Sequence, residues 1–221
     1  MKINILSILL VIAFAGNAQI NKEELSLKIS KAEDANLQSL KEFIWKRKSD
    51  VSLGGVKKLT TLTEFSFNAD GKLEAKLVDA ESDVKKKPGL RGRAQESAIG
   101  DKMDYVEKAL GLAVKYSFMS KGELLDFFSK ATVTDKGATQ EATAENVYIQ
   151  GDKLTVVVDS KTFLFSFKKF SSFLGKDPVD GELNYEPFTS DISHGTTTVL
   201  NMPAQKMKID AVNQDYTKGV K

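Results

Sequence analysis

The period of the hydrophobic pattern changes several times along the chain, and this order of periods restricts the fold more than any other feature. From Asn21, apolar residues recur at helical spacing without Gly or Pro, which predicts an amphipathic helix over about 21–41. Apolar and polar residues then alternate in three segments joined by short turn sequences: Phe43–Leu53, Leu59–Phe67 and Lys72–Val78. Connections this short join antiparallel strands only, so we expect a meander.

Helical spacing returns after a polar connection at 79–93. The apolar residues with this spacing predict one buried stripe: Ile99, Met103, Val106, Leu110 and Val114. A short second helix is expected over about 121–130, with four apolar residues near its end: Leu124, Leu125, Phe127 and Phe128. These two helices would form an insertion between two groups of strands.

Strand patterns dominate again after Thr132. Segments 146–150 and 153–159 flank Gly151-Asp152, which predicts a hairpin. A strand through Phe163–Phe167, a turn at 177–181 and three further strands follow, near 182–190, 195–201 and 205–213. The prediction is an α+β fold with a single curved antiparallel sheet of about nine strands, a half-barrel. The N-terminal helix and the two-helix insertion would cover its concave face.

The N-terminus has the pattern of a secretory signal peptide. Met1-Lys2 precedes an uncharged apolar run, and Gly16 and Ala18 supply the small residues of a cleavage site. The run is too short for a membrane-spanning helix, which needs roughly 20 apolar residues. We therefore expect a signal peptide at 1–18 and one domain at 19–221. With no Cys in the chain there is no lipid attachment and no disulfide, which favours the periplasm, with secretion as the runner-up.

Composition argues against most chemistry. A formal net charge of +2 gives no electrostatic footprint for nucleic acid. The absence of Cys removes thiolate nucleophiles and Cys-ligated metals, and a single His, His194, leaves little for a triad or a His cluster. We found no motif for a nucleotide, a calcium ion or a serine nucleophile. The sequence thus predicts no catalytic residues, no metal, no cofactor and no enzyme.

One local segment is strongly basic despite the near-neutral average: Lys85, Lys86, Lys87, Arg91 and Arg93. Such a patch can contact an anionic membrane surface or an acidic partner. A solvated loop that keeps the chain soluble is the other interpretation, and it is the favoured one.

Aromatic residues form the second local feature. They lie in alternation on the predicted strands: Trp45, Phe65, Phe67, Phe163, Phe165 and Phe167. In a closed sandwich these rings would be core. On the concave face of a curved sheet, they would line a cavity for an acyl chain or another apolar ligand.

The order of elements resembles the periplasmic outer-membrane lipoprotein carrier superfamily. The resemblance rests on Phe43-Ile44-Trp45, the strand pair through Thr63–Leu73 and the Phe163–Phe167 strand. It implies an open half-barrel that shelters lipid chains beneath helices. The chain departs from the carriers in placing its long helices after only about three strands. It also lacks a recognisable lipoprotein-accepting Arg in an apolar strand, for which Arg47 is the nearest candidate.

These features predict a noncatalytic envelope protein that binds a lipid, a lipid-modified protein or another apolar ligand between sheet and helices. The helix with Leu124, Phe127 and Phe128 would act as a lid that moves to admit the ligand. The alternative is a protein-interaction or regulatory module whose core is fully packed. The oligomeric state does not follow from the sequence.

Overall fold

The computed structural model describes residues 21–82, 90–189 and 192–219, which form three α-helices and ten strands. The helices are α1 (Lys22–Leu40), α2 (Leu90–Ser117) and α3 (Lys121–Lys130). The first strands are β1 (Phe43–Leu53), β2 (Val56–Phe67), β3 (Leu73–Ser82), β4 (Thr132–Asp135) and β5 (Thr139–Glu145). The others are β6 (Lys153–Asp159), β7 (Phe165–Leu174), β8 (Asp177–Thr189), β9 (Ile192–Met202) and β10 (Met207–Lys218).

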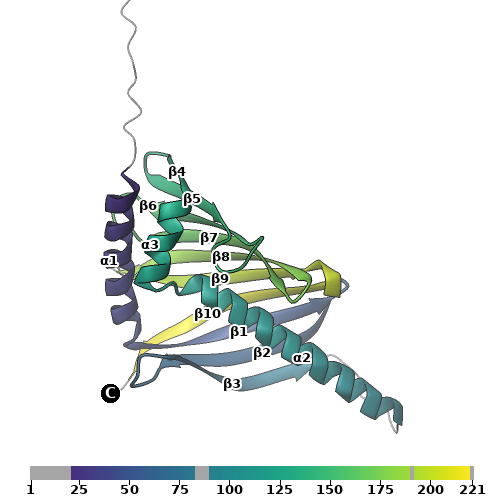
Figure 1. Ribbon diagram of the computed structural model, residues 1–221. Helices are drawn as coiled ribbons and strands as arrows, with labels where there is room; N and C mark the ends of the chain where they lie inside the picture. The colour runs from purple at the N-terminus through teal and green to yellow at the C-terminus, as the bar shows by residue number, and fades with distance from the viewer. Residues whose placement is uncertain (1–20, 83–89, 190–191, 220–221) are drawn as a thin grey trace, which may run out of the picture.

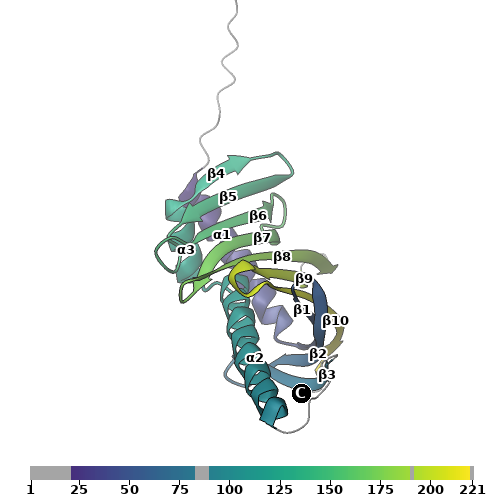
Figure 2. The same ribbon diagram turned by 90° about the vertical axis from the view of Figure 1, so that its right-hand side faces the viewer.

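All ten strands belong to one open antiparallel sheet with the order β3-β2-β1-β10-β9-β8-β7-β6-β5-β4. The first hairpins join the rest of the sheet where β1 pairs with β10, from Phe43 opposite Lys218 to Leu53 opposite Met207. Figures 1 and 2 show the sheet curving around the helices, with α2 running diagonally across it. The predicted α+β class and the curved antiparallel sheet are confirmed, with ten strands rather than about nine.

The helices follow the predicted boundaries closely, and local caps explain why. Asn21 accepts a hydrogen bond from the backbone of Glu24 at the start of α1. Ser120 and Glu123 form a capping box at the start of α3. α1 packs on α3 and β9, whereas α2 packs on β7, β8 and β9. Only the connection before α2 is shorter than expected, because β3 extends to Ser82 and α2 begins at Leu90.

The buried stripe of α2 is rotated from the predicted one. Val106 is buried as expected, but the other buried positions are Ala109, Ala113 and Tyr116. Met103, Leu110 and Val114 are half-buried, and the side chain of Ile99 lies outside the described residues. Small residues allow α2 to approach the sheet, where the Tyr116 ring stacks on Phe170 at 4.2 Å.

Two segments were assigned wrongly from the sequence. Residues 146–150 form a turn, because Asp152 is completely buried and accepts hydrogen bonds from the backbone amides of Tyr148 and Ile149 and from the Tyr116 hydroxyl. The predicted turn at 177–181 is instead the start of β8, since the chain reverses at Gly175, which has a φ of +64°. In the first case the turn is longer than the two residues Gly151-Asp152, and in the second the Asp, Pro and Gly residues lie within a strand.

Candidate functional site: a pocket between helix α1 and the sheet

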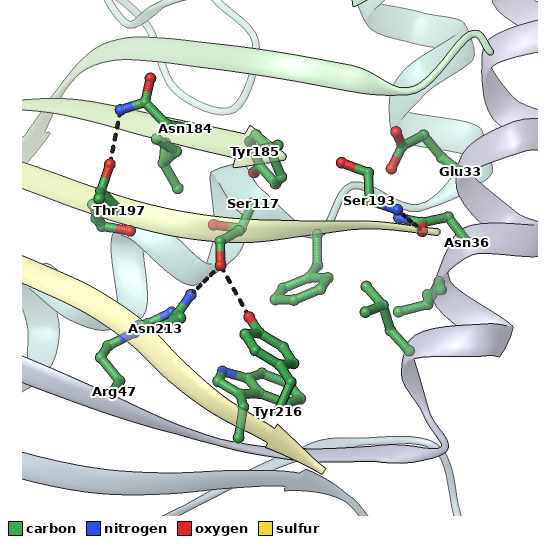
Figure 3. A pocket seen from close by; sticks show the side chains of 17 residues that line it. Glu33, Asn36, Arg47, Ser117, Asn184, Tyr185, Ser193, Thr197, Asn213 and Tyr216 are labelled. Atoms are coloured by element: carbon green, nitrogen blue, oxygen red, sulfur yellow. Dashed lines mark hydrogen bonds between the residues drawn. The ribbon is translucent and has the colours of Figure 1, made fainter. Parts of the chain in front are cut away.

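A small cavity lies between α1, the C-terminal end of α2 and the concave face of β1 and β8–β10 (Figure 3). Its volume is about 50 Å³, room for roughly four water molecules. Its apolar walls are Leu37, Leu40, Trp45, Phe118, Leu183 and Tyr216, and its polar walls include Glu33, Asn36, Arg47, Tyr185, Ser193 and Asn213. We call this cavity the inner pocket.

A bulge in β10 builds one wall of the inner pocket. The register between β1 and β10 shifts around Trp45, and Asp215 has a left-handed φ of +55°. This irregularity lets the Tyr216 ring stack on Trp45, at 5.5 Å and nearly parallel. Phe65 stacks on Trp45 at 5.6 Å. Trp45 is therefore held between two rings and is almost fully buried.

Trp45 belongs to a continuous cluster of aromatic rings at the end of the sheet near the C-terminus of α1. Each ring contacts at least one other member at centroid distances of 4.6–6.2 Å. We call this set the aromatic cluster: Phe43, Trp45, Phe65, Phe67, Phe118, Phe188, His194 and Tyr216. Burial lowers the pKa of His194, so its imidazole is neutral near pH 7 and packs as another ring.

A second cavity adjoins the aromatic cluster on its outer side. It has a volume of about 560 Å³ and opens to solvent, with Lys41, Glu42, Asn68, Phe43, Ile44 and Phe67 among its walls. Phe67 contacts both Trp45 and Phe118, which line the inner pocket. The Phe67 ring thus separates this outer cavity from the inner pocket.

Arg47 is the buried cation of the inner pocket. Arg47 lies on β1 and is only 7% exposed. Its guanidinium lies 4.6 Å from the centre of the Phe65 ring. Its Nε donates to Asn213 Oδ1 at 2.8 Å, and the Asn213 amide and the Tyr216 hydroxyl both donate to the Gly195 carbonyl. Burial lowers the pKa of Arg47, although a guanidinium stays protonated.

Helix α1 is fastened to the sheet by two polar side chains one turn apart. Glu33 Oε1 accepts from the backbone N–H of Phe165 at 3.0 Å, and Asn36 Oδ1 accepts from that of Ser193 at 2.8 Å. The two N–H groups belong to Phe165, the first residue of β7, and to Ser193, the second residue of β9. Burial raises the pKa of Glu33, and the charge of Lys168 opposes this effect.

Lys168 is the second buried cation, on β7 and only 1% exposed. Its Nζ donates to the carbonyl oxygens of Ser117 at 2.7 Å and Tyr116 at 3.4 Å, which end α2, and it lies 3.9 Å from the centre of the Phe165 ring. A cation at a helix C-terminus is favourable because the carbonyls there are unpaired. Burial still lowers the pKa of Lys168 to about 8, while Glu33 acts to raise it.

The structure brings together part of the predicted ligand-binding set. Trp45, Phe65 and Phe67 lie in the aromatic cluster, and Phe165 lies beneath Lys168 in a neighbouring cavity between α1 and α2. The expectation that Phe163, Phe165 and Phe167 share one face is wrong. Phe163 precedes β7 with a φ of +59°, and a bulge between Phe165 and Phe167 puts Phe167 opposite Val157, on the convex face.

The residues expected on the lid helix lie in the core. Leu124, Phe127 and Phe128 are each 1% exposed and belong to the hydrophobic core, where α3 packs on α1 and on β5 of the sheet. Leu124 also borders the cavity between α1 and α2. The element that covers the inner pocket is α1, which supplies Glu33, Asn36, Leu37 and Leu40. Moving α3 would expose the largest side chains of this part of the core.

Other predicted features fall partly beyond the described residues. The signal peptide and Lys85, Lys86 and Lys87 lie outside them, while Arg91 and Arg93 are on the first turn of α2, where the backbone alone is described. Within the described ranges, no group of His, Cys, Asp and Glu residues could hold a metal ion. None of the helices in that part of the chain combines the length and apolar character needed to cross a membrane.

Sequence reasoning did not assign Glu33, Lys168 or Tyr185 to the site. Glu33 lies in a helix segment with many charged residues, and Lys168 lies at the end of a strand segment. In the sequence, neither residue can be distinguished from a charged residue exposed to solvent. The bulge in β7 that turns Lys168 inward depends on its partner strand, not on its own sequence. Only the Arg47 side chain had a local signal, since it alternates in phase with Trp45.

No protein-family model matches the sequence, and no curated protein matches it. The fold is similar to that of a LolA superfamily protein from Nitrosomonas europaea, at 10% identity and a TM-score of 0.42, over 88% of this chain and 94% of that one. It is also similar to a DUF1329 family protein from Desulfovibrio piger, at 10% identity and a TM-score of 0.40, over 90% of this chain and 92% of that one. The first of these two structures belongs to the superfamily that the order of elements resembles.

Proposed function

We propose that the protein is an exported, noncatalytic binder of a lipid, a lipid-modified protein or another apolar ligand. The observation that supports this function is the aromatic cluster, which runs without interruption from the outer cavity to the inner pocket. Aromatic side chains offer large apolar surfaces that a flexible chain can pack against. In this proposal the ligand enters past Phe67 and reaches the space under α1.

Binding would require α1 to shift, because the inner pocket holds only about 50 Å³. Helix α1 can shift more easily than a helix with a wide apolar face, because only three of its hydrophobic residues are buried. These residues are Leu25, Ile29 and Leu40. Its polar attachments, through Glu33 and Asn36, are hydrogen bonds that a shift of the helix can break and remake.

A neutral fluorescent dye, N-phenyl-1-naphthylamine, tests this function without an assumption about charge. The dye should gain fluorescence on the purified mature protein, and Phe67→Glu should weaken its affinity by about tenfold or more, because a carboxylate would stand between the cavities. Phe173→Glu is the matched control, since Phe173 is a partly exposed strand residue outside the aromatic cluster. Absence of dye binding, or an equal effect of both substitutions, would refute the proposal.

Export is the second part of the proposal and rests on the sequence of residues 1–18. Protein isolated from the periplasm of cells that produce the full chain should begin at Gln19. Detection of Met1 on that protein by mass spectrometry would contradict cleavage. The basic segment could hold the exported protein near an anionic membrane, and Arg91→Glu with Arg93→Glu should then weaken binding to anionic liposomes.

A protein-interaction module is the second candidate, and two observations favour it. The inner pocket is small, and β3 is an edge strand whose Leu77 and Val78 are 56% and 49% exposed. An unpaired strand edge can accept a strand from a partner. Native mass spectrometry of the purified protein separates the candidates, because a binder of apolar ligands should carry or exchange lipid and a packed module should not.

A further inference from the structure

The interior around α1 contains more positive than negative charge. Arg47 and Lys168 are 7% and 1% exposed, and the carboxylate that faces this region is that of Glu33 on α1. The charge of Glu33 acts on Lys168, whose pKa it raises. Among the described residues, Arg47 makes no ion pair with any carboxylate. A buried cation without an anion is costly, so Arg47 needs an explanation.

Two further polar atoms on the walls of the inner pocket lack partners. The hydroxyl of Tyr185 and the Nε1 of Trp45 are buried, and neither has a partner with good hydrogen-bond geometry among the described residues, although Ser117 lies close enough to Tyr185 to lower its pKa. Both can donate a hydrogen bond, as can the remaining N–H groups of the Arg47 guanidinium, of which only Nε has a bond to Asn213. Buried donors without acceptors are rare in proteins, and two of them belong to residues that line this one cavity, beside the Arg47 guanidinium.

The Tyr216 hydroxyl and the Asn213 amide are not free to join them, since both donate to the carbonyl of Gly195. Burial raises the pKa values of Tyr185 and Tyr216 well above the ordinary tyrosine value, so both are neutral donors at physiological pH. His194, next to Tyr216, is neutral as well. Glu33 is thus the one acidic group that lines the inner pocket within the described ranges.

We propose that the inner pocket binds a single anionic headgroup, held by the guanidinium of Arg47, the hydroxyl of Tyr185 and the indole N–H of Trp45. A carboxylate or phosphate oxygen accepts hydrogen bonds and does not donate them when ionised, which matches a site made of donors. The volume of about 50 Å³ fits a group of this size, and the adjoining Leu37, Leu40 and Phe118 suit the first carbons of an alkyl chain. The ligand class is therefore an anionic amphiphile.

This inference rests on the proposed function, because the alkyl part of the ligand would occupy the path past the aromatic cluster. The test compares three amphiphiles with the same chain by isothermal titration calorimetry at pH 7: dodecanoate, dodecyl phosphate and dodecanol. At least one anion should bind about tenfold or more tightly than dodecanol. The tighter of the two anions shows whether the natural headgroup is a carboxylate or a phosphate.

Variants of the pocket assign the preference to named groups. Arg47→Gln should remove most of the preference for the anion, a loss of about 10- to 100-fold, while Arg47→Lys should restore part of it by keeping the charge. Tyr185→Phe should weaken anion binding by about three- to tenfold with little change in the melting temperature, since its hydroxyl makes no hydrogen bond of good geometry. Tyr105→Phe is the matched control, because Tyr105 is a partly buried tyrosine on α2 outside this pocket.

Glu33→Gln gives the most discriminating result. The Glu33 carboxylate lines the same pocket and repels an anion, so its neutral amide should tighten dodecanoate binding by about threefold or more. If Glu33 had a purely structural role, Glu33→Gln would bind dodecanoate with the same or a lower affinity than the native protein. Equal affinity of dodecanol and both anions, with no change in Tyr185→Phe, would overturn the inference while leaving the proposed function intact. Failure of all three amphiphiles to bind would reject the proposed function itself.

Discussion

The Nζ of Lys168 donates to the carbonyl oxygen of Ser117 at 2.7 Å, and this contact ties the central sheet to the C-terminal end of α2. A lysine that is 1% exposed usually has a carboxylate in direct contact, yet here the acceptors are backbone carbonyls. Glu33 acts on it through space, without a direct ion pair. The contact therefore couples strand β7, helix α2 and helix α1 through one ammonium group.

Removing that ammonium group should destabilise the fold. Lys168→Met leaves the Glu33 carboxylate without its cation and the carbonyls of Tyr116 and Ser117 without their donor. We expect the free energy of unfolding at pH 7 to fall by about 3 kcal/mol, measured by urea denaturation. Glu33→Gln in the same chain should recover about 1 kcal/mol or more of this loss. Simple additivity of the two substitutions would contradict the coupling.

The same lysine predicts how stability changes with pH. The pKa of Lys168 is about 8 in the folded protein and 10.5 in a free chain, so between these values the unfolded state binds more protons. Stability should therefore rise with pH in this window. The gain from pH 7.5 to 9.5 should be about 2 kcal/mol larger in the native protein than in Lys168→Met. Above pH 10 the raised pKa values of the buried tyrosines oppose the trend.

Gly181 should tolerate no side chain. A Cβ at this position of β8 would overlap the ring of Phe170, which lies opposite it on β7 and stacks on Tyr116. Gly181→Ala should lower the free energy of unfolding by about 2 kcal/mol or more, since the ring has little room to move. Gly111→Ala is the control: Gly111 is exposed within α2 with open space around it, so alanine should add about 0.5–1 kcal/mol.

Asp152 should resist replacement even by its amide. Its buried carboxylate accepts from the hydroxyl of Tyr116 at 2.6 Å and from the amide of Tyr148 at 2.9 Å. In Asp152→Asn, an N–H₂ group would face these donors, and we expect a loss of about 2–3 kcal/mol in thermal or urea unfolding. Asp126→Asn, which breaks an exposed pair with Lys130, should change stability by less than about 0.5 kcal/mol.

The local hydrophobic pattern was sufficient to predict most helices and strands, but not which side chains point toward the interior. Alternation placed Leu59, Phe65 and Trp45 on one side of β1 and β2, and the structure pairs Trp45 with Phe65 directly. The same rule failed for Phe167, because a bulge against β6 reverses the alternation. A bulge is set by the partner strand and leaves no periodic signal in its own sequence.

The candidate site was harder to predict than the fold for a related reason. Its aromatic members are bulky and alternate, so Trp45, Phe65 and Phe67 could be named from the sequence. The two buried cations, Arg47 and Lys168, are 121 positions apart in the sequence. The local sequence around each of them is that of an ordinary surface residue. Only the burial of both in one interior, found from the three-dimensional arrangement, distinguishes them from the many solvated charges of this chain.

The pairing of β1 with β10 sets the order in which the chain can fold. The first three strands can form hairpins early, but their place in the sheet exists only when the last strand, which ends at Lys218, is present. Closing such a distant contact is slow compared with local pairing. For a chain that crosses a membrane before it folds, this topology delays completion of the sheet until the C-terminal strand has emerged. In the export that we propose, the open sheet would thus be completed after transport rather than during synthesis.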